Sequence, residues 1–242
     1  MVGFADIHNH ILFKVDDGAD SIETSMEMVK EEYDQGARSL ILTPHYDEES
    51  FNLSVDRWNR RFADLESAVK EEFPDMKLYL GNEVLLCNDM IEKLEAGKIL
   101  TMASTRYVLI EFYPMEDYGT IERALSQLVN GGYIPIIAHC ERYKAFRKKI
   151  GIINKTNLDH VIDMGCYLQV NATSVYREDK KFVKKLIENE MLHLIGTDAH
   201  SVKRRGVHWE ECIDYLESEY DEKLVEWLLV RNPNMIISGE YI

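Results

Sequence analysis

The stretch VGFADIHNH, residues 2–10, is a short apolar run that ends in two histidines separated by one residue. Its length and composition predict a strand. Because side chains alternate along a strand, His8 and His10 would lie on the same face of it. The stretch therefore predicts a buried strand whose end carries a pair of imidazoles.

Six further apolar runs follow, and most of them precede a stretch with helical patterning. The seven runs cover residues 2–8, 39–45, 77–83, 106–112, 133–139, 167–171 and 192–198, and the helical stretches cover 21–36, 54–73, 120–130, 155–164, 179–190 and 208–219. At the first helix, Asp20 and Glu23 have the spacing of a capping box and Gly36 marks the end. Strands that alternate with helices indicate parallel βα units, and seven units favour a barrel over a small open sheet.

The composition indicates one globular domain over residues 1–242, since 45% of the residues are hydrophobic and no linker or repeat interrupts the chain. No apolar stretch is long enough to span a membrane, and the N-terminus lacks the pattern of a signal peptide. Four cysteines occur without CxxC pairing, which is typical of a reduced, cytoplasmic protein.

The formal net charge of −15 excludes some classes of partner. Such a surface repels nucleic-acid phosphates and anionic membranes, so neither is expected to bind. A negatively charged substrate would need local positive charge at its site, from bound cations or from a few arginines.

Six of the seven runs end at or beside a residue type that binds metal ions. These residues are His8, His10, His45, Glu83, Glu111, His139, Asp198 and His200. The remaining run ends in Asn171, and the turn FKVDDGAD (13–20) adds the carboxylates of Asp16 and Asp17. In parallel α/β folds the C-terminal strand ends share one face, so these side chains would converge there. Imidazoles and carboxylates without thiolates suit zinc, manganese or iron.

Each of these residues alone is more often structural than functional. A lone histidine after a strand is usually a hydrogen-bonded loop residue, and DDG is common turn chemistry. The coincidence at successive strand ends instead predicts a polynuclear metal site. His160 does not fit this pattern and is assigned a structural or solvent role, and His193 lies at the wrong end of its strand.

The motifs resemble a known superfamily. HNH at 8–10, Asp17, His45, Glu83, Glu111, His139 and DAH at 198–200 resemble the polymerase and histidinol phosphatase (PHP) superfamily. The segments DIHNHILFKVDDGADS, LILTPHY, GNEV, RYVLIEF, PIIAHCERY, MGCYLQVN and NPNMII are similar to one branch of it. That branch comprises bacterial metal-dependent protein-tyrosine phosphatases that act on capsule and exopolysaccharide tyrosine kinases. The resemblance implies an α/β fold, a distorted (β/α)7 TIM-like barrel with the metal site at the C-terminal strand ends.

The resemblance also implies two to three divalent metal ions, with manganese first and iron or zinc as alternatives. The implied ligands are His8, His10, Glu83 and Asp198 for the first ion, Glu83, Glu111 and His139 for the second, and Asp17, His45 and His200 for the third. All nine positions hold the residue types that the superfamily uses.

Two arginines are implied to bind the phosphate, because a guanidinium fork matches phosphate oxygens. Arg142 follows His139, and Arg205 is the better match in the loop SVKRRGVHW, with Arg204 left open. Asp198 is a candidate to assist the leaving group. His208 either donates a proton or packs locally and caps the next helix.

Cys140 raises a competing interpretation, because cysteine-dependent phosphatases use the order His-Cys-five residues-Arg. Here the position that needs arginine is Phe146, and ERYKAF has no glycine for a phosphate-binding loop. Cys140 is therefore predicted to be a small buried residue at a strand end.

The predicted function is hydrolysis of phosphotyrosine by a metal-activated water, without a covalent intermediate. The expected partner is a phosphotyrosine protein such as a bacterial tyrosine kinase, and Tyr46, Tyr113 and Tyr118 are candidates to stack on the substrate ring. The alternatives are a PHP phosphatase for a small phosphomonoester such as histidinol phosphate, and a non-catalytic metal-stabilised regulatory module. A nuclease is disfavoured by the charge, and an amidohydrolase by the lack of a lysine at any run end. The sequence leaves the oligomeric state open.

Overall fold

Every strand pairing in the structure is parallel. The computed structural model describes residues 1–51, 54–147, 156–177 and 179–242. Its strands are β1 (Phe4–Asp6), β2 (Ala37–Leu42), β3 (His45–Tyr46), β4 (Lys77–Leu80), β5 (Glu83–Leu85), β6 (Tyr107–Glu111), β7 (Ile134–Ile137), β8 (Tyr167–Asn171) and β9 (Leu194–Gly196). One sheet has the order β1-β2-β4 and the other the order β3-β5-β6-β7-β8-β9. The predicted parallel βα organisation is confirmed.

The second and third predicted runs each divide into two strands. The first break lies at Thr43 and Pro44, between β2 and β3, and the second at Gly81 and Asn82, between β4 and β5. Proline has no N–H to continue the ladder, and the Asn82 side chain donates to the Pro44 carbonyl across the two breaks at 3.0 Å. The described residues therefore contain nine strands in two sheets, where the pattern predicted seven strands.

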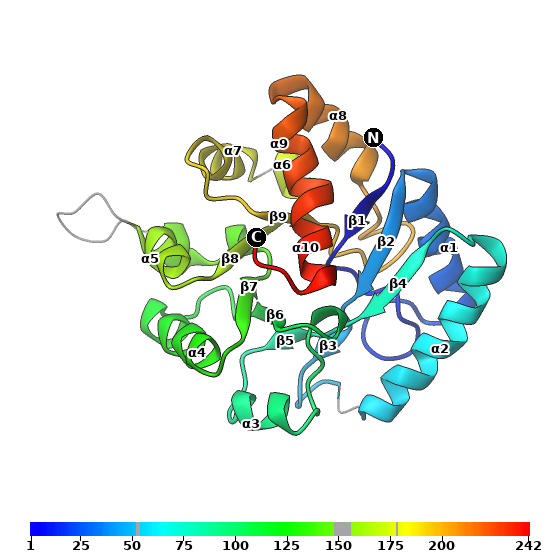
Figure 1. Cartoon of the computed structure of the whole chain (residues 1–242), viewed down its shortest axis with the longest axis horizontal. Coiled ribbons are helices and arrows are strands. Elements are labelled where there is room, and N and C mark those ends of the chain that lie inside the picture. Colours follow the sequence, from blue (N-terminus) through cyan, green and yellow to red (C-terminus); the bar gives the residue numbers. More distant parts are fainter. Residues whose placement is uncertain (52–53, 148–155, 178) are drawn as a thin grey trace.

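The two sheets meet beside the HNH stretch. The His10 N–H donates to the Ala199 carbonyl at 2.8 Å, and the Asp198 N–H donates to the His8 carbonyl at 2.7 Å. These bonds place the ends of β1 and β9 side by side, so the two sheets form one curled surface. Figure 1 shows the strands curling around the centre of the molecule, with most helices on the outside and α10 over the middle of the view.

All six predicted helical stretches contain helices, and several short helices were not predicted. The helices are α1 (Ile22–Asp34), α2 (Val55–Glu72), α3 (Met90–Glu95), α4 (Tyr118–Asn130), α5 (Asn157–Asp163), α6 (Ala172–Tyr176), α7 (Lys180–Glu188), α8 (Trp209–Glu219), α9 (Glu222–Glu226) and α10 (Asn232–Ser238). A π-helical turn, Trp227–Arg231, joins the last two. None of the described helices is both long and apolar enough to cross a membrane.

The predicted capping box of α1 is wrong by one residue. Ser21, not Asp20, is the N-cap, and its hydroxyl accepts a hydrogen bond from the Thr24 N–H at 3.2 Å. Asp20 instead accepts from the Thr24 hydroxyl at 2.7 Å. Asp and Ser are both favoured N-caps, so local preference alone did not separate these neighbours.

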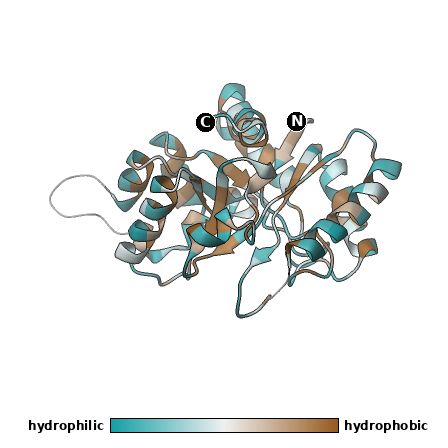
Figure 2. Ribbon diagram, turned by 60° about the horizontal axis from the view of Figure 1, so that its bottom comes forward, coloured by the Kyte–Doolittle hydropathy of each residue, from teal (hydrophilic) through white to brown (hydrophobic). Residues whose placement is uncertain are grey.

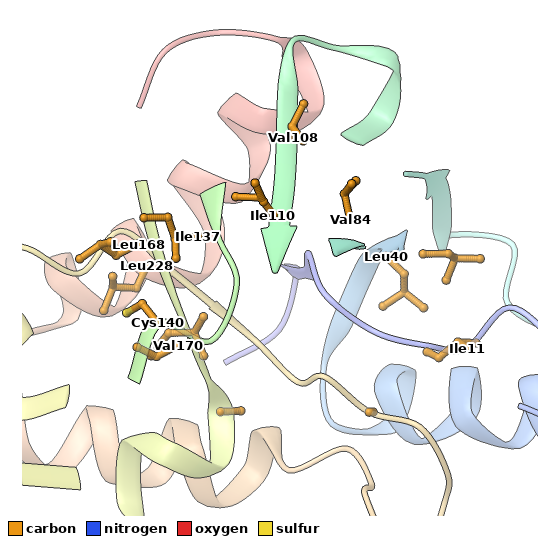
Figure 3. Close-up of a cluster of buried hydrophobic side chains, with 14 of the residues drawn as sticks. Ile11, Leu40, Val84, Val108, Ile110, Ile137, Cys140, Leu168, Val170 and Leu228 are labelled. Carbon is orange, nitrogen blue, oxygen red and sulfur yellow. The ribbon is translucent and has the colours of Figure 1, made fainter. Parts of the chain in front are cut away.

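Two apolar clusters hold the sheets in place. The inner one is enclosed by the strands, and Ile236 of α10 packs against it together with Ile7 and Leu109. The outer one lies between strands and helices, and Figure 2 shows mainly brown, hydrophobic colour on the central strands. Figure 3 shows Cys140 beside Val170 in the outer cluster. Cys140 is fully buried, as predicted.

Gly196 makes room where β9 passes β1. A methyl group at this position would lie 2.6 Å from the His8 Cβ and 3.2 Å from the Gln169 Nε2. We therefore expect Gly196→Ala to lower the free energy of unfolding by about 1–3 kcal/mol, the usual cost of overpacking. Urea unfolding in chelator measures this without any contribution from metal binding.

Gly131→Ala is the matched control. There the nearest atom to an added methyl is the flexible end of Ile91, at 3.1 Å. Its effect should stay within about 1 kcal/mol. Equal losses in both variants would contradict the close approach of β9 to His8.

Candidate metal centre

The metal-binding residue types come together at one edge of the sheets, mostly just after a strand but at the first residue of β3 and of β5. Three groups have ligand atoms within 4.8 Å of one another, namely His8, His10, Glu83 and Asp198; His10, Asp17, His45 and His200; and His45, Glu83 and Glu111. The group of His8, His10, Glu83 and Asp198 matches the ligand set implied for the first ion. The group with Asp17 contains all three ligands implied for the third ion, Asp17, His45 and His200. The shared residues His10, His45 and Glu83 join the groups into one cluster.

Glu83 lies at the centre of the cluster and is fully buried. Its Oε1 is 3.2 Å from His8 Nε2 and 2.8 Å from His139 Nε2. Its Oε2 is 3.2 Å from His10 Nε2 and 3.0 Å from His45 Nδ1. One carboxylate thus faces four imidazoles, and each oxygen faces two of them.

Three of the histidines are held in the tautomer that a metal ligand needs. The Nδ1 atoms of His8, His10 and His200 face acceptor oxygens of Gln169, Asp16 and the Asp198 backbone at 3.1, 2.8 and 2.9 Å. With Nδ1 protonated, the lone pair of each ring is on Nε2.

The Nε2 atoms of these rings are buried and lack hydrogen-bond partners among the described residues, and so does Oε2 of Glu83. Buried polar atoms are normally paired, so such a gathering of acceptors needs an explanation. A divalent cation supplies one, because neutral imidazoles and carboxylates are its ligands. The donor set therefore fits metal ions.

Asp17, His45 and His200 form the outer part of the cluster. Asp17 Oδ1 is 3.5 Å from His45 Nε2 and 3.3 Å from His200 Nε2. Asp17 is the most exposed of the predicted ligands, with about half of its side chain accessible (53%). The open side of the cluster therefore lies here.

The carboxylate of Asp16, which the turn suggested as a further metal-binding oxygen, is engaged by donors of the protein itself. Its carboxylate is occupied by His10 Nδ1 at 2.8 Å, the Gly18 N–H at 2.9 Å and the His45 N–H at 3.0 Å. Gly18 is required for this turn, since a methyl group there would lie 2.0 Å from the His10 carbonyl oxygen. The DDG motif thus combines an orienting carboxylate, an exposed carboxylate and a glycine.

His139 joins the cluster from the end of β7. Its Nε2 is 3.3 Å from Glu111 Oε1 as well as close to Glu83, and its Nδ1 is 3.2 Å from the Tyr143 hydroxyl. His139 and Asp198 both have left-handed backbones, with φ of 30° and 54°. That conformation is costly for non-glycine residues and clusters at functional sites. In both cases it turns the chain directly after a strand.

The two predicted arginines meet at Asp198. Arg142 Nη2 is 2.6 Å from Asp198 Oδ2, and Arg205 Nη2 is 2.8 Å from Asp198 Oδ1. Their side chains stay 40% and 45% exposed, so both guanidinium groups lie at the rim. Arg204 is exposed, and its backbone N–H donates to Ser201. Of the neighbouring pair, Arg205 is thus the one that contacts Asp198, while both line a pocket with Asp17 and His200.

Several other sequence-based candidates have local roles. His208 precedes α8 and lies 3.6 Å from Glu211, which agrees with local packing, but its side chain makes no capping hydrogen bond. Tyr46 is buried against Trp58, so it is not available to stack on a substrate. The Tyr118 hydroxyl is bonded to His160 at 2.7 Å, and Tyr113 is exposed.

Burial and charge act against each other in the cluster. Burial lowers the pKa of His139, but hydrogen bonds to Glu111 and Glu83 outweigh it and raise the pKa to about 9. Burial likewise raises the pKa of Glu83, but His8 and the other imidazoles hold the pKa well below its usual value. Without metal, a proton on His139 thus compensates part of the buried carboxylate charge.

The sequence interpretation missed the residues that orient the ligands. Gln169 and Asn171 of β8 and Tyr143 all hydrogen-bond to predicted ligands. The available signal was the run YLQVN, where polar residues alternate with apolar ones inside an otherwise buried strand. Such alternation places both amides on one face.

Comparison with known proteins shows extensive similarity. The family "Capsular polysaccharide synthesis, CpsB/CapC" matches residues 4–238. "Tyrosine-protein phosphatase CpsB" of Streptococcus pneumoniae is 34% identical, covering 98% of this chain and 99% of its own. "Tyrosine-protein phosphatase YwqE" of Bacillus subtilis is 30% identical, with 98% and 92% covered.

The solved structures agree with these matches. A structure described as "YwqE from Bacillus subtilis and CpsB from Streptococcus pneumoniae, unique metal-dependent tyrosine phosphatases" superposes with a TM-score of 0.87 at 28% identity, covering 98% of this chain and 96% of that one. A phosphotriesterase homology protein of Escherichia coli, at 14% identity, 97% and 98% coverage and a TM-score of 0.59, shares the fold alone. The predicted resemblance to bacterial metal-dependent tyrosine phosphatases is confirmed.

The raised pKa of His139 predicts how metal affinity depends on pH. A divalent ion that binds at the predicted ligand His139 must displace the proton of this imidazole, whose pKa is about 9. The apparent affinity for Mn²⁺ should therefore rise with pH, by up to about tenfold per unit below pH 9 for each proton displaced. Isothermal titration at about pH 6.5 and about pH 8.5, in buffers of different ionisation enthalpy, measures both the affinity and the protons released.

His160 provides the control, because its ring contacts Tyr118 and not the cluster. His160→Asn should keep the pH dependence of the wild-type chain. A Mn²⁺ affinity that does not change over this pH range would contradict the protonated state of His139.

Proposed function

The chain belongs to the capsular polysaccharide synthesis CpsB/CapC family, and we propose that it is a metal-dependent protein-tyrosine phosphatase. The observation that carries this proposal is the set of buried acceptor atoms around Glu83 without hydrogen-bond partners among the described residues. Two rim arginines lie beside these atoms, at Asp198. Together they suit a phosphate held between metal ions and guanidinium groups.

We assign two to three divalent ions, with manganese as the first candidate, to the cluster. The ligands would be His8, His10, Glu83 and Asp198 for one ion, Glu83, Glu111 and His139 for another, and Asp17, His45 and His200 for a third. The two oxygens of Glu83 face different imidazoles, which supports a bridging role. When bound, the ions would supply the Lewis acidity that activates a water molecule.

The protein's own residues then bind and orient the phosphate. Arg142 and Arg205 approach from opposite oxygens of Asp198, and each guanidinium carries further N–H donors for phosphate oxygens. Their fixed charge would offset the charge of the transferring group. The leaving group is a phenolate with a pKa of about 10, so it needs less protonation than an alkoxide.

A broad cleft, lined in part by the segments that follow β3, β5 and β6, supports a polypeptide substrate. It has a volume of about 620 Å³ and is lined by Asp47, Leu85, Cys87, Tyr113 and Arg123, among others. Asp47 and Tyr113 each lie two residues beyond a proposed ligand, His45 and Glu111, and Leu85 pairs in register with Glu111. The described residues that line this cleft include no proposed ligand, whereas Asp17, His200 and Arg205 line a separate pocket of about 340 Å³.

The wider context follows from the family and from the cysteines. The family's description places its members in capsular polysaccharide synthesis, which supports a tyrosine kinase of that process as the phosphorylated partner. All four cysteines are free thiols, which supports a cytoplasmic location. We further propose that the two sheets represent the distorted (β/α)7 barrel of a single domain.

Phosphate release from a phosphotyrosine peptide tests the proposal. The Mn²⁺-loaded protein should hydrolyse the peptide faster than free phosphotyrosine or histidinol phosphate, and chelator should abolish the activity. Cys140→Ser should retain most activity, because Cys140 is buried and burial raises the pKa of its thiol well above the usual value. Chelator-resistant activity that is lost in Cys140→Ser would overturn the metal mechanism. A preference for histidinol phosphate would support the alternative of a small-molecule phosphatase. If no substrate is hydrolysed, the alternative of a non-catalytic regulatory module is supported.

The neighbouring arginines Arg204 and Arg205 offer a matched pair of variants. Arg205→Ala should lower kcat/KM by about 10²–10³-fold, the range for losing one donor to transition-state charge. Arg204→Ala removes the same side chain one residue away and should stay within about threefold of wild type. Steady-state kinetics on one peptide measure both, and the reverse order would assign the phosphate contact to Arg204.

A further inference from the structure

Two amide side chains of strand β8 connect proposed metal ligands to one another. Gln169 Oε1 lies 3.1 Å from His8 Nδ1, and Gln169 Nε2 lies 3.2 Å from Asn171 Oδ1. Asn171 Nδ2 in turn lies 2.8 Å from Asp198 Oδ2. The chain of contacts thus begins at one ligand of the first ion, His8, and ends at another, Asp198.

One backbone group fixes the direction of every bond in this chain. The His139 N–H lies 2.7 Å from Gln169 Oε1, and a backbone N–H only donates. The atom that it meets must therefore be the amide oxygen of Gln169. The opposite orientation of the amide would place its NH₂ group against the His139 N–H.

The orientation of Gln169 determines the tautomer of His8. Because the amide oxygen only accepts, the His8 Nδ1 opposite it must carry the proton. The lone pair of His8 is then on Nε2, which faces Glu83 Oε1 at 3.2 Å.

The same orientation sets the far end of the chain. Gln169 Nε2 donates to the Val170 carbonyl at 2.7 Å and to Asn171 Oδ1. Asn171 therefore presents its NH₂ group to Asp198 Oδ2. This bond leaves Asp198 Oδ1 facing the cluster, 3.5 Å from His10 Nε2 and 3.8 Å from His8 Nε2.

The two amides are themselves rigidly held. Gln169 is fully buried and Asn171 nearly so. The Asn171 N–H donates to the buried carboxylate of Glu141 at 2.9 Å, and its backbone pairs with Gly196 of β9. Gly196 also leaves space for the Gln169 side chain, since a methyl group there would lie 3.2 Å from Gln169 Nε2.

We propose that Gln169 and Asn171 are positioning residues that act as one unit on the first metal ion. They hold His8 in the tautomer with its lone pair on Nε2 and Asp198 with Oδ1 toward the His8 and His10 rings, where these residues would hold the ion. The inference rests on the proposed function because it takes His8 and Asp198 as ligands. Outer hydrogen bonds of this kind typically change metal affinity by about 10–100-fold.

Metal titration of variants tests this proposal without any measurement of phosphatase activity. We expect Gln169→Leu and Asn171→Leu each to weaken Mn²⁺ binding by about 10–100-fold. Since both substitutions break the same chain of hydrogen bonds, the loss of Mn²⁺ affinity in the double variant should be clearly smaller than the product of the two single fold-losses. Gln169→Glu keeps an acceptor for His8 but sets a carboxylate oxygen against the Val170 carbonyl and Asn171 Oδ1, so it should break the Asn171 end of the chain and weaken Mn²⁺ binding as well.

Tyr167→Phe is the matched control on the same strand. It removes a hydrogen bond to the Ile242 carbonyl at the other end of β8, 2.9 Å long, and should change Mn²⁺ affinity by less than about twofold. Circular dichroism and thermal unfolding in chelator establish that each variant is folded. If Gln169→Leu does not fold, Gln169→Glu and Asn171→Leu with their double variant make the same comparison.

The outcomes separate this proposal from the proposed function. Wild-type affinity in folded Gln169 and Asn171 variants, or single losses that multiply in the double variant, would overturn the positioning role and leave the metal centre intact. Failure of the wild-type chain to bind Mn²⁺ or another divalent ion would overturn both.

Discussion

The buried carboxylate of Glu83 among four imidazoles is the interaction on which the site depends. A charge without compensation in such a position would be strongly destabilising. Here compensation comes from surrounding groups that carry protons or, in the proposed holoprotein, share metal ions with it. His139, with a pKa of about 9, shows the first of these arrangements. The same atoms thus serve folding and ligand binding.

The parallel sheets meet this requirement by bringing distant residues to one edge. His8 follows β1, His45 begins β3 and Glu83 begins β5, while His139 follows β7. Apolar side chains of β2, β6, β7 and β9 form the inner cluster with Ile236 of α10, and the polar groups of the site stand at strand boundaries. The two strand breaks at Pro44 and Gly81 contribute to this arrangement, because the short strands after them place His45 and Glu83 directly opposite each other in register.

The precision of the cluster comes from residues that are not ligands. Asp16 orients His10, Gln169 orients His8, and the backbone of Asp198 orients His200. The left-handed backbone conformation at His139 and Asp198 costs conformational energy, which the surrounding hydrogen bonds must offset. Stability and metal affinity are therefore expected to be linked, because the same bonds maintain both.

The sequence by itself determined the alternation of strands and helices, the residue types at the strand ends and the family resemblance. These features are local, since apolar period and short motifs depend only on neighbouring residues. Only the tertiary structure decided that Asp16 orients while Asp17 stays exposed, and that Arg205 rather than Arg204 reaches Asp198. The same holds for the amide chain from Gln169 to Asp198. Those roles depend on which donor meets which acceptor across separate strands, and no local pattern encodes such a meeting.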